Sequence, residues 1–232
     1  MAFSTRFRNA LLALVVATLG VLLAVSALGA TDFDKLLATL TQRWGPGPTQ
    51  KFNAWRTLIT NTSNLSDNDR LKRVNDFFNR QMRFGEDADI WNQPDYWATP
   101  MESIGQGAGD CEDFAIAKYF TLREAGVAPN KLRLIYVRAA TGSSAGAPSQ
   151  AHMVLAYYAQ PEAEPLVLDN LINDIRPASR RPDLVPVFSF NSDGVFTGGA
   201  KETAPSAGTG RLSRWEDLLK RARAEGFELA PN

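Results

Sequence analysis

The sequence is poor in cysteine and histidine, two residue types that often have catalytic roles. Its 232 residues include one cysteine, Cys111, and one histidine, His152. A single cysteine excludes an internal disulfide, so the thiol is free. The 25 Lys and Arg residues equal the 25 Asp and Glu residues in number, and this balance removes the positive field that indicates a nucleic-acid partner. The chain also lacks an internal repeat, a coiled-coil heptad and the spacing of an EF-hand.

The first 30 residues differ from the rest of the chain. Arg6 and Arg8 precede an apolar run that ends in small residues near Ala30, which is the pattern of an export signal. The run over residues 10–30 is also close to the roughly 20 residues that span a bilayer, so an uncleaved inner-membrane anchor is the alternative. In either case we expect residues 31–232 to form one domain outside the cytoplasm. A free cysteine in such a domain suggests that the thiol is used.

Cys111 lies where a loop is expected to become a helix. The Gly-rich run over residues 105–109 predicts irregular structure, and apolar residues recur at helical spacing from Phe114 onward. Asp110 is a typical N-cap residue, and Asp113 could complete a capping box. The positive end of a helix dipole favours the thiolate, which is the nucleophilic form of cysteine. The alternative interpretation is a small buried cysteine that packs a helix end.

Apolar periodicity predicts an α+β fold. Helical spacing predicts a central helix that starts near Cys111 and closes at Ala125-Gly126, and further helices over residues 31–43, over 49–59, after a Ser66 cap, and over 212–226. Alternating or continuous apolar runs predict strands over residues 132–139, 151–158 and 166–170, and a hairpin over 185–196. We therefore expect N-terminal helices, with the central helix packed on an antiparallel sheet.

The single histidine falls inside the second predicted strand. Direct pairing of His152 with Asp169 on the next strand requires a turn centred between Gln160 and Pro161, inside the predicted connection. The two side chains can then be neighbours within about two residues of register. A carboxylate beside an imidazole fixes its tautomer and stabilises the imidazolium. A hydrogen-bonded structural histidine is the alternative.

An aromatic segment without periodicity precedes the cysteine. Trp91, Tyr96 and Trp97 lie in a Pro-flanked stretch that could form the wall of a substrate cleft or cap the core. An indole N–H of Trp97 near the thiolate would be a second oxyanion donor beside the backbone N–H of Cys111.

Three sequence blocks together resemble a known family. They are GDCED with AKY over residues 109–119, AHMVL over 151–155, and VLDNL over 167–171, followed by RPDL over 181–184 and Phe190-Asn191. Their order and compact spacing resemble the bacterial transglutaminase-like cysteine proteinases, and within these the LapG-type periplasmic proteases. The resemblance runs from about Lys72 to Asn191 and implies a papain/transglutaminase-like core.

The resemblance implies a function and a set of site residues. The protein would be a periplasmic endopeptidase that cleaves a large surface adhesin near its N-terminus at an Ala-Ala site and releases cells from a biofilm. A membrane receptor that senses cyclic di-GMP would sequester it. Cys111 would be the nucleophile, His152 the general base and Asp169 its orienting partner. LapG-type proteases depend on calcium, and the matching ligand positions are Asp110, Glu112 and Asn130.

The charges around the thiol support a bound cation independently of the resemblance. Asp110, Glu112 and Asp113 surround Cys111, and three carboxylates raise a thiol pKa. A hard cation held by oxygen ligands would cancel that effect. Simple capping of the helix is the alternative role for Asp110 and Asp113. Two other functions stay open: a transglutaminase-type acyltransferase, and a non-catalytic calcium-binding adaptor in the periplasm.

Overall fold

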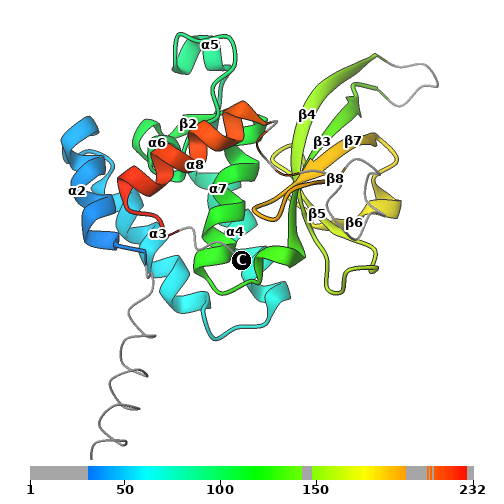
Figure 1. Cartoon of the computed structure of the whole chain (residues 1–232), viewed down its shortest axis with the longest axis horizontal. Coiled ribbons are helices and arrows are strands. Elements are labelled where there is room, and N and C mark those ends of the chain that lie inside the picture. Colours follow the sequence, from blue (N-terminus) through cyan, green and yellow to red (C-terminus); the bar gives the residue numbers. More distant parts are fainter. Residues whose placement is uncertain (1–30, 143–147, 197–207, 209, 211, 229–232) are drawn as a thin grey trace, which may run out of the picture.

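Helices gather on one side of the molecule and a sheet on the other, with α7 between them (Figure 1). The computed structural model describes residues 31–142, 148–196, 208, 210 and 212–228. The predicted leader lies outside these residues. None of the helices in the described ranges has the length and apolar character needed to cross a bilayer. The helices are α2 Phe33–Trp44, α3 Thr49–Thr62, α4 Asp67–Gln81, α5 Asp87–Ile90, α6 Pro100–Gln106, α7 Cys111–Glu124 and α8 Ser213–Glu225, with short 3-10 turns η1 Pro129–Lys131 and η2 Ala178–Arg180.

The long helices begin and end where the sequence predicts. The Ser66 hydroxyl accepts from the Asp69 amide and caps α4. Gly126, with a φ of 90°, follows α7 and stops it, because a left-handed residue cannot continue a helix. The predicted helices over residues 31–43, 49–59 and 212–226 correspond to α2, α3 and α8, so local periodicity is enough to find them.

The prediction of irregular structure over residues 105–109 is wrong. A complete capping box between Thr99 and Glu102, with Pro100 in the first turn, starts α6, and this helix runs through Gly105 to Gln106. Glycine is required there because a Cβ on Gly105 would lie 2.5 Å from the Trp44 ring. The next residues form β2 (Ala108–Gly109), which pairs in parallel with β1 (Arg83–Phe84). This pairing holds the segment after β1 beside the start of α7.

The larger sheet of the described residues has six antiparallel strands in the order β6-β5-β4-β3-β7-β8. Its predicted strands and hairpin are confirmed. β5 is only three residues long and pairs with the Leu155–Tyr157 end of β4. The end of β4 that carries His152 therefore extends past β5. The strands are β3 Leu132–Ala140, β4 Ser149–Tyr157, β5 Leu166–Leu168, β6 Arg176–Pro177, β7 Leu184–Phe190 and β8 Val195–Phe196.

One core joins the helices to the sheet. Phe120 of α7 and Trp215 of α8 pack in the same cluster as Met153 and Leu155 of β4. Val154, which alternates with these two strand residues, belongs to a smaller cluster on the opposite face of the sheet. Because α7 packs between both layers, its first residue is held at a fixed place beside β4. The structure thus has the predicted α+β architecture.

Candidate active site

Cys111 and His152 line one cleft of about 580 Å³. Its walls come from the start of α7, from β4, from the segment that follows β1, and from the start of α8. The structure therefore brings the only thiol and the only imidazole of the chain to the same cavity, although 40 residues separate them in the sequence.

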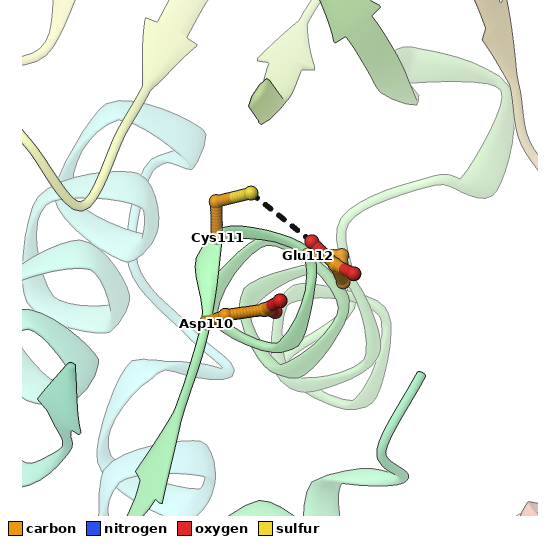
Figure 2. Close-up of side chains that lie close together, drawn as sticks. All are labelled: Asp110, Cys111 and Glu112. Carbon is orange, nitrogen blue, oxygen red and sulfur yellow. Dashed lines mark hydrogen bonds between the residues drawn. The ribbon is translucent and has the colours of Figure 1, made fainter. Parts of the chain in front are cut away.

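The thiol of Cys111 is half-buried in the first turn of α7. Figure 2 shows its sulfur turned toward Glu112, to which Sγ donates a hydrogen bond of 3.0 Å. Burial raises the thiol pKa, and the charge and hydrogen bond of Glu112 raise it further, while a backbone hydrogen bond from Met153 lowers it. Without a cation, burial and the carboxylates outweigh the helix dipole, and the thiol keeps its proton.

His152 and Asp169 form a buried pair. His152 Nε2 lies 2.8 Å from Asp169 Oδ1, and both side chains are at most 3% exposed. Leu155 pairs with Leu168, so the register differs by two residues from the one that would place His152 directly opposite Asp169. The side chains still meet, because diagonal neighbours on antiparallel strands are within reach. This agrees with the predicted tolerance in register.

The charge of Asp169 is well compensated. Oδ1 also accepts from the Leu171 amide at 3.0 Å, and Oδ2 accepts from Arg181 at 2.8 Å. Burial opposes ionisation, but the hydrogen bond and charge of His152, with the hydrogen bonds from the Leu171 amide and Arg181, lower the pKa of Asp169 to about 2. An ionised Asp169 only accepts hydrogen bonds, so Nε2 of His152 carries the hydrogen and Nδ1 is left to take a proton.

A second group of carboxylates gathers at the start of α7. Ligand oxygens of Asp87, Asp110 and Asp113 lie within 4.8 Å of one another. One buried oxygen of each has no hydrogen-bond partner among the described residues. Burial and the neighbouring carboxylates raise the pKa of Asp87 to about 6 and of Asp110 to about 10, and that of Asp113 well above its usual value. Carboxylate oxygens that lack hydrogen-bond partners and lie this close together are suited to bind a hard cation such as Ca²⁺.

Glu112 extends the same cluster toward the sulfur. Its carboxylate lies within reach of Asp110 and Cys111, and also of Asp87 and Asp95. Figure 2 shows Asp110 and Glu112 side by side at the start of α7. The two predicted calcium ligands Asp110 and Glu112 are therefore brought together.

Asn130 is not brought to this cluster. It lies in η1, beyond the opposite end of the 14-residue α7, which at the usual rise of an α-helix is about 20 Å long. The ligand set implied by the resemblance is thus corrected, because α7 separates Asn130 from Asp110. Asp87 and Asp113 are the additional acids that the structure supplies.

The alternative in which Asp110 and Asp113 simply cap α7 holds only in part. Asp110 occupies the N-cap position of α7, but its side chain makes no capping hydrogen bond. Asp113 accepts from the Ala98 amide at 2.7 Å and thereby ties the aromatic segment to the helix. The Asp110 carboxylate instead belongs to the acidic cluster.

The aromatic segment both lines the cleft and packs on the core. Trp97 lines the cavity and stacks on Phe190 at 5.6 Å, with an interplanar angle of 14°. Its carbonyl accepts from Arg221 of α8 at 2.6 Å. Both alternatives for this segment therefore apply to Trp97, and its role as an oxyanion donor stays a prediction.

Sequence reasoning missed two contributions to the site. Asp87 comes from a segment without periodicity, and its nearness to Asp110 depends on the pairing of Phe84 with Gly109. Arg181 was noted only as part of a resembling motif, and no local pattern signals its contact with Asp169.

Comparisons with known proteins agree with this geometry. Residues 53–182 match the model of the bacterial transglutaminase-like cysteine proteinase family, BTLCP. A structure of Legionella pneumophila LapG is 38% identical, covers 83% of this chain and 98% of that chain, and has a TM-score of 0.70. An EGTA-treated LapG from the same organism is 39% identical, with the same coverage and a TM-score of 0.71.

A calcium-bound Legionella pneumophila LapG is also 39% identical, covers 80% of this chain and 96% of that chain, and has a TM-score of 0.67. No match was found among curated proteins. The family model spans more than half of the 232 residues, and the similarity to LapG extends over most of the chain. This chain belongs to the bacterial transglutaminase-like cysteine proteinases.

Proposed function

We propose that the protein is a calcium-dependent cysteine endopeptidase of the LapG type. Cys111 is its nucleophile, His152 its general base and Asp169 the partner of His152. The observation that carries this proposal is the buried hydrogen bond of 2.8 Å between His152 and Asp169 in a molecule whose only thiol lines the same cleft as His152. Membership of a family of cysteine proteinases supports it.

The mechanism follows from the hydrogen-bond roles of the three side chains. Asp169 accepts from Nε2 of His152, so Nδ1 takes the proton of the Cys111 thiol. The thiolate attacks the substrate carbonyl, and the backbone N–H of Cys111, with Trp97 as the second donor, stabilises the oxyanion. The imidazolium then returns its proton to the leaving amine. Water, deprotonated by His152, hydrolyses the thioester and restores the free thiol.

Calcium would be held by Asp110 and Glu112, with Asp87 and Asp113 beside them. Its positive charge would neutralise the carboxylates that raise the pKa of Cys111. The unpaired oxygens of Asp87, Asp110 and Asp113 support this assignment, and so does the calcium-bound state of a similar LapG. In this account, Glu112 accepts the thiol hydrogen only while no ion is bound.

The physiological setting is proposed from the family resemblance. The substrate is the N-terminal region of a large surface adhesin, cut near an Ala-Ala pair in the periplasm, and the cut promotes biofilm dispersal. An inner-membrane receptor for cyclic di-GMP controls access to the protease. A tether through residues 10–30 would keep the enzyme at the same membrane if the leader is retained.

Incubation of the purified protein with the adhesin N-terminal region tests the proposal. We expect cleavage with calcium, little cleavage with a chelator, and none for Cys111→Ala or His152→Ala, with circular dichroism unchanged in both variants. Cleavage by either variant at the parental rate would refute the assigned roles. Adding a primary amine distinguishes hydrolysis from acyl transfer, because an acyltransferase would give isopeptide-linked products.

A non-catalytic calcium-binding adaptor is the second candidate, favoured by the protonated thiol that donates to Glu112. It predicts calcium binding and partner capture without any labelling of Cys111 by a peptide electrophile. Because the chain has one cysteine, the site of any label is unambiguous.

A further inference from the structure

We propose that Arg181 is a positioning residue that holds Asp169 in the orientation required by His152. The inference rests on the proposed function, because it assigns Arg181 a role through the Asp169–His152 pair. Arg181 does not touch the thiol or the cleft, so its effect would pass through the imidazole alone.

The contacts of Asp169 fix its carboxylate in one orientation. Oδ1 faces His152 Nε2 at 2.8 Å, and Oδ2 accepts from Arg181 Nη2 at 2.8 Å. Each oxygen therefore has its own strong partner, and rotation of the carboxylate would break both hydrogen bonds. Asn79 of α4 donates to the Asp169 carbonyl at 2.8 Å, so the backbone at this position is held as well.

Arg181 is itself anchored on its other side. Its Nε lies 3.0 Å from Asp183 Oδ1, and its Nη2 lies 2.7 Å from Asp183 Oδ2. The Asp183 carbonyl accepts from the Ala140 amide at 2.8 Å, at the end of β3. The planar guanidinium thus links a fixed point of the sheet to Asp169, and a lysine could not reproduce this forked geometry.

The burial of Arg181 argues against a role in stability alone. Its side chain is 2% exposed, whereas that of Asp183 is 39% exposed. Its Nη1 is buried without a hydrogen-bond partner among the described residues. Desolvation of a guanidinium is costly, and a buried ion pair often contributes little net stability. Orientation of Asp169 accounts for a buried arginine better than stabilisation of the fold does.

A second basic side chain interacts with the same carboxylate from α7. Lys118 lies two helical turns after Cys111, is 1% exposed, and interacts electrostatically with Asp169. Residues seven apart share one face of a helix. The face of α7 that carries Cys111 at its start therefore also carries Lys118, whose pKa burial lowers to about 7. The hydrogen bonds of Asp169 with His152, the Leu171 amide and Arg181 keep it ionised, in agreement with its pKa of about 2.

The test compares Arg181→Lys with Arg180→Lys in the calcium-loaded protein. Arg180 is the exposed neighbour of Arg181, so the same chemical change is made one residue away. The probe is a peptide vinyl sulfone with an Ala-Ala sequence, which labels Cys111. We expect Arg181→Lys to lower the maximal labelling rate about 10- to 100-fold with little change in the half-saturating concentration, as loss of an orienting partner does. Arg180→Lys should match the parent.

The single histidine supplies a spectroscopic readout that a purely structural role would not move. Nitrogen-15 spectra report the tautomer of the neutral imidazole when recorded in the Cys111→Ala background, where no thiol proton can reach it. We expect hydrogen on Nε2 when Arg181 is present and a mixture of tautomers with Arg181→Lys. Guanidinium ion should partly restore labelling of Arg181→Ala. Asp183→Asn, which keeps Arg181 and loses its anchor, should show a smaller loss, and it tests the proposal even if substitution of Arg181 prevents folding.

The inference is overturned if folded Arg181→Lys keeps the parental labelling rate and tautomer. It is also overturned if Arg181 variants do not fold and Asp183→Asn behaves as the parent. The proposed function fails by a different result: the parent protein does not label at Cys111, or His152→Ala labels as fast as the parent.

Discussion

Two sets of buried carboxylates at the candidate site differ in what balances their charge. Asp169 is hydrogen-bonded to His152, Arg181 and the Leu171 amide, and its pKa is about 2. Asp110, with Asp87 and Asp113, has acidic neighbours, and its pKa is about 10. Residues of the chain balance the charge of the first set, whereas in the proposed function a bound cation would balance the second. We infer that orientation of the imidazole is built into the fold, while reactivity of the thiol depends on a bound ion.

Removal of the charge of Asp169 should have the largest effect. We expect Asp169→Asn to lower the rate of substrate cleavage by about 10⁴-fold, because the amide favours the wrong tautomer of the imidazole. Calcium should not rescue this loss. Asp174→Asn, which removes an exposed carboxylate paired with Arg176, is the control and should cleave normally. If calcium restored cleavage by Asp169→Asn, the proposed distinction between the two carboxylate sets would be wrong.

Chelation of calcium should have the next largest effect. Glu112 raises the thiol pKa in the ion-free protein, so we expect alkylation of Cys111 by iodoacetamide at pH 7 to slow by at least about 10-fold. The measurement is the rate of single-site labelling, with calcium added back as the control. Equal rates with and without calcium would mean that the acidic cluster does not control the sulfur.

Asp110→Asn should stabilise the ion-free protein and reduce the stabilisation that calcium gives. The carboxyl of Asp110 has a folded pKa raised to about 10, so the folded ion-free protein must hold a proton that the unfolded chain releases above about pH 4. Asparagine does not ionise, so the substitution removes the free energy that keeping Asp110 protonated costs the folded protein. At pH 7 we expect the ion-free variant to melt higher than the ion-free parent, by about 2–4 °C for each kcal/mol gained, and to gain less from calcium. Asp34→Asn, at an exposed residue of α2, is the control.

The smallest effect expected is on the pH dependence of calcium binding. Protons compete with the ion for the raised carboxyls, and Asp87, with a pKa of about 6, takes up a proton as the pH falls from 7 to 5. Calorimetry in buffers of different ionisation enthalpy should show proton release on calcium binding at pH 7. Affinity should fall about tenfold per pH unit for each proton released. Binding without proton release would contradict the raised pKa values.

The fold was predictable wherever one element carries its own signal. Ser66 before an apolar stripe marks α4, and alternation marks β3 and β4. The approach of His152 to Asp169 was also predictable, because the turn-forming residues between their strands leave little freedom of register. These are local patterns or single connections.

The acidic cluster and the Arg181 contact were not predictable in the same way. Asp87 and Asp110 meet because two-residue strands pair Phe84 with Gly109, and strands so short leave no alternation to detect. Arg181 and Asp169 are 12 residues apart in the sequence, and their contact depends on how the whole sheet folds. The resemblance placed Asn130 among the ligands, and only the length of α7 shows that it lies elsewhere.

The most direct test of the central claim is the pH profile of Cys111 alkylation in calcium, for the parent and for His152→Ala. If the imidazole takes the thiol proton, the parent should react rapidly at pH values well below the ordinary thiol pKa of about 8.5. The variant should react only as that pH is approached. Superimposable profiles would contradict the account, because they would show that His152 does not act on the sulfur.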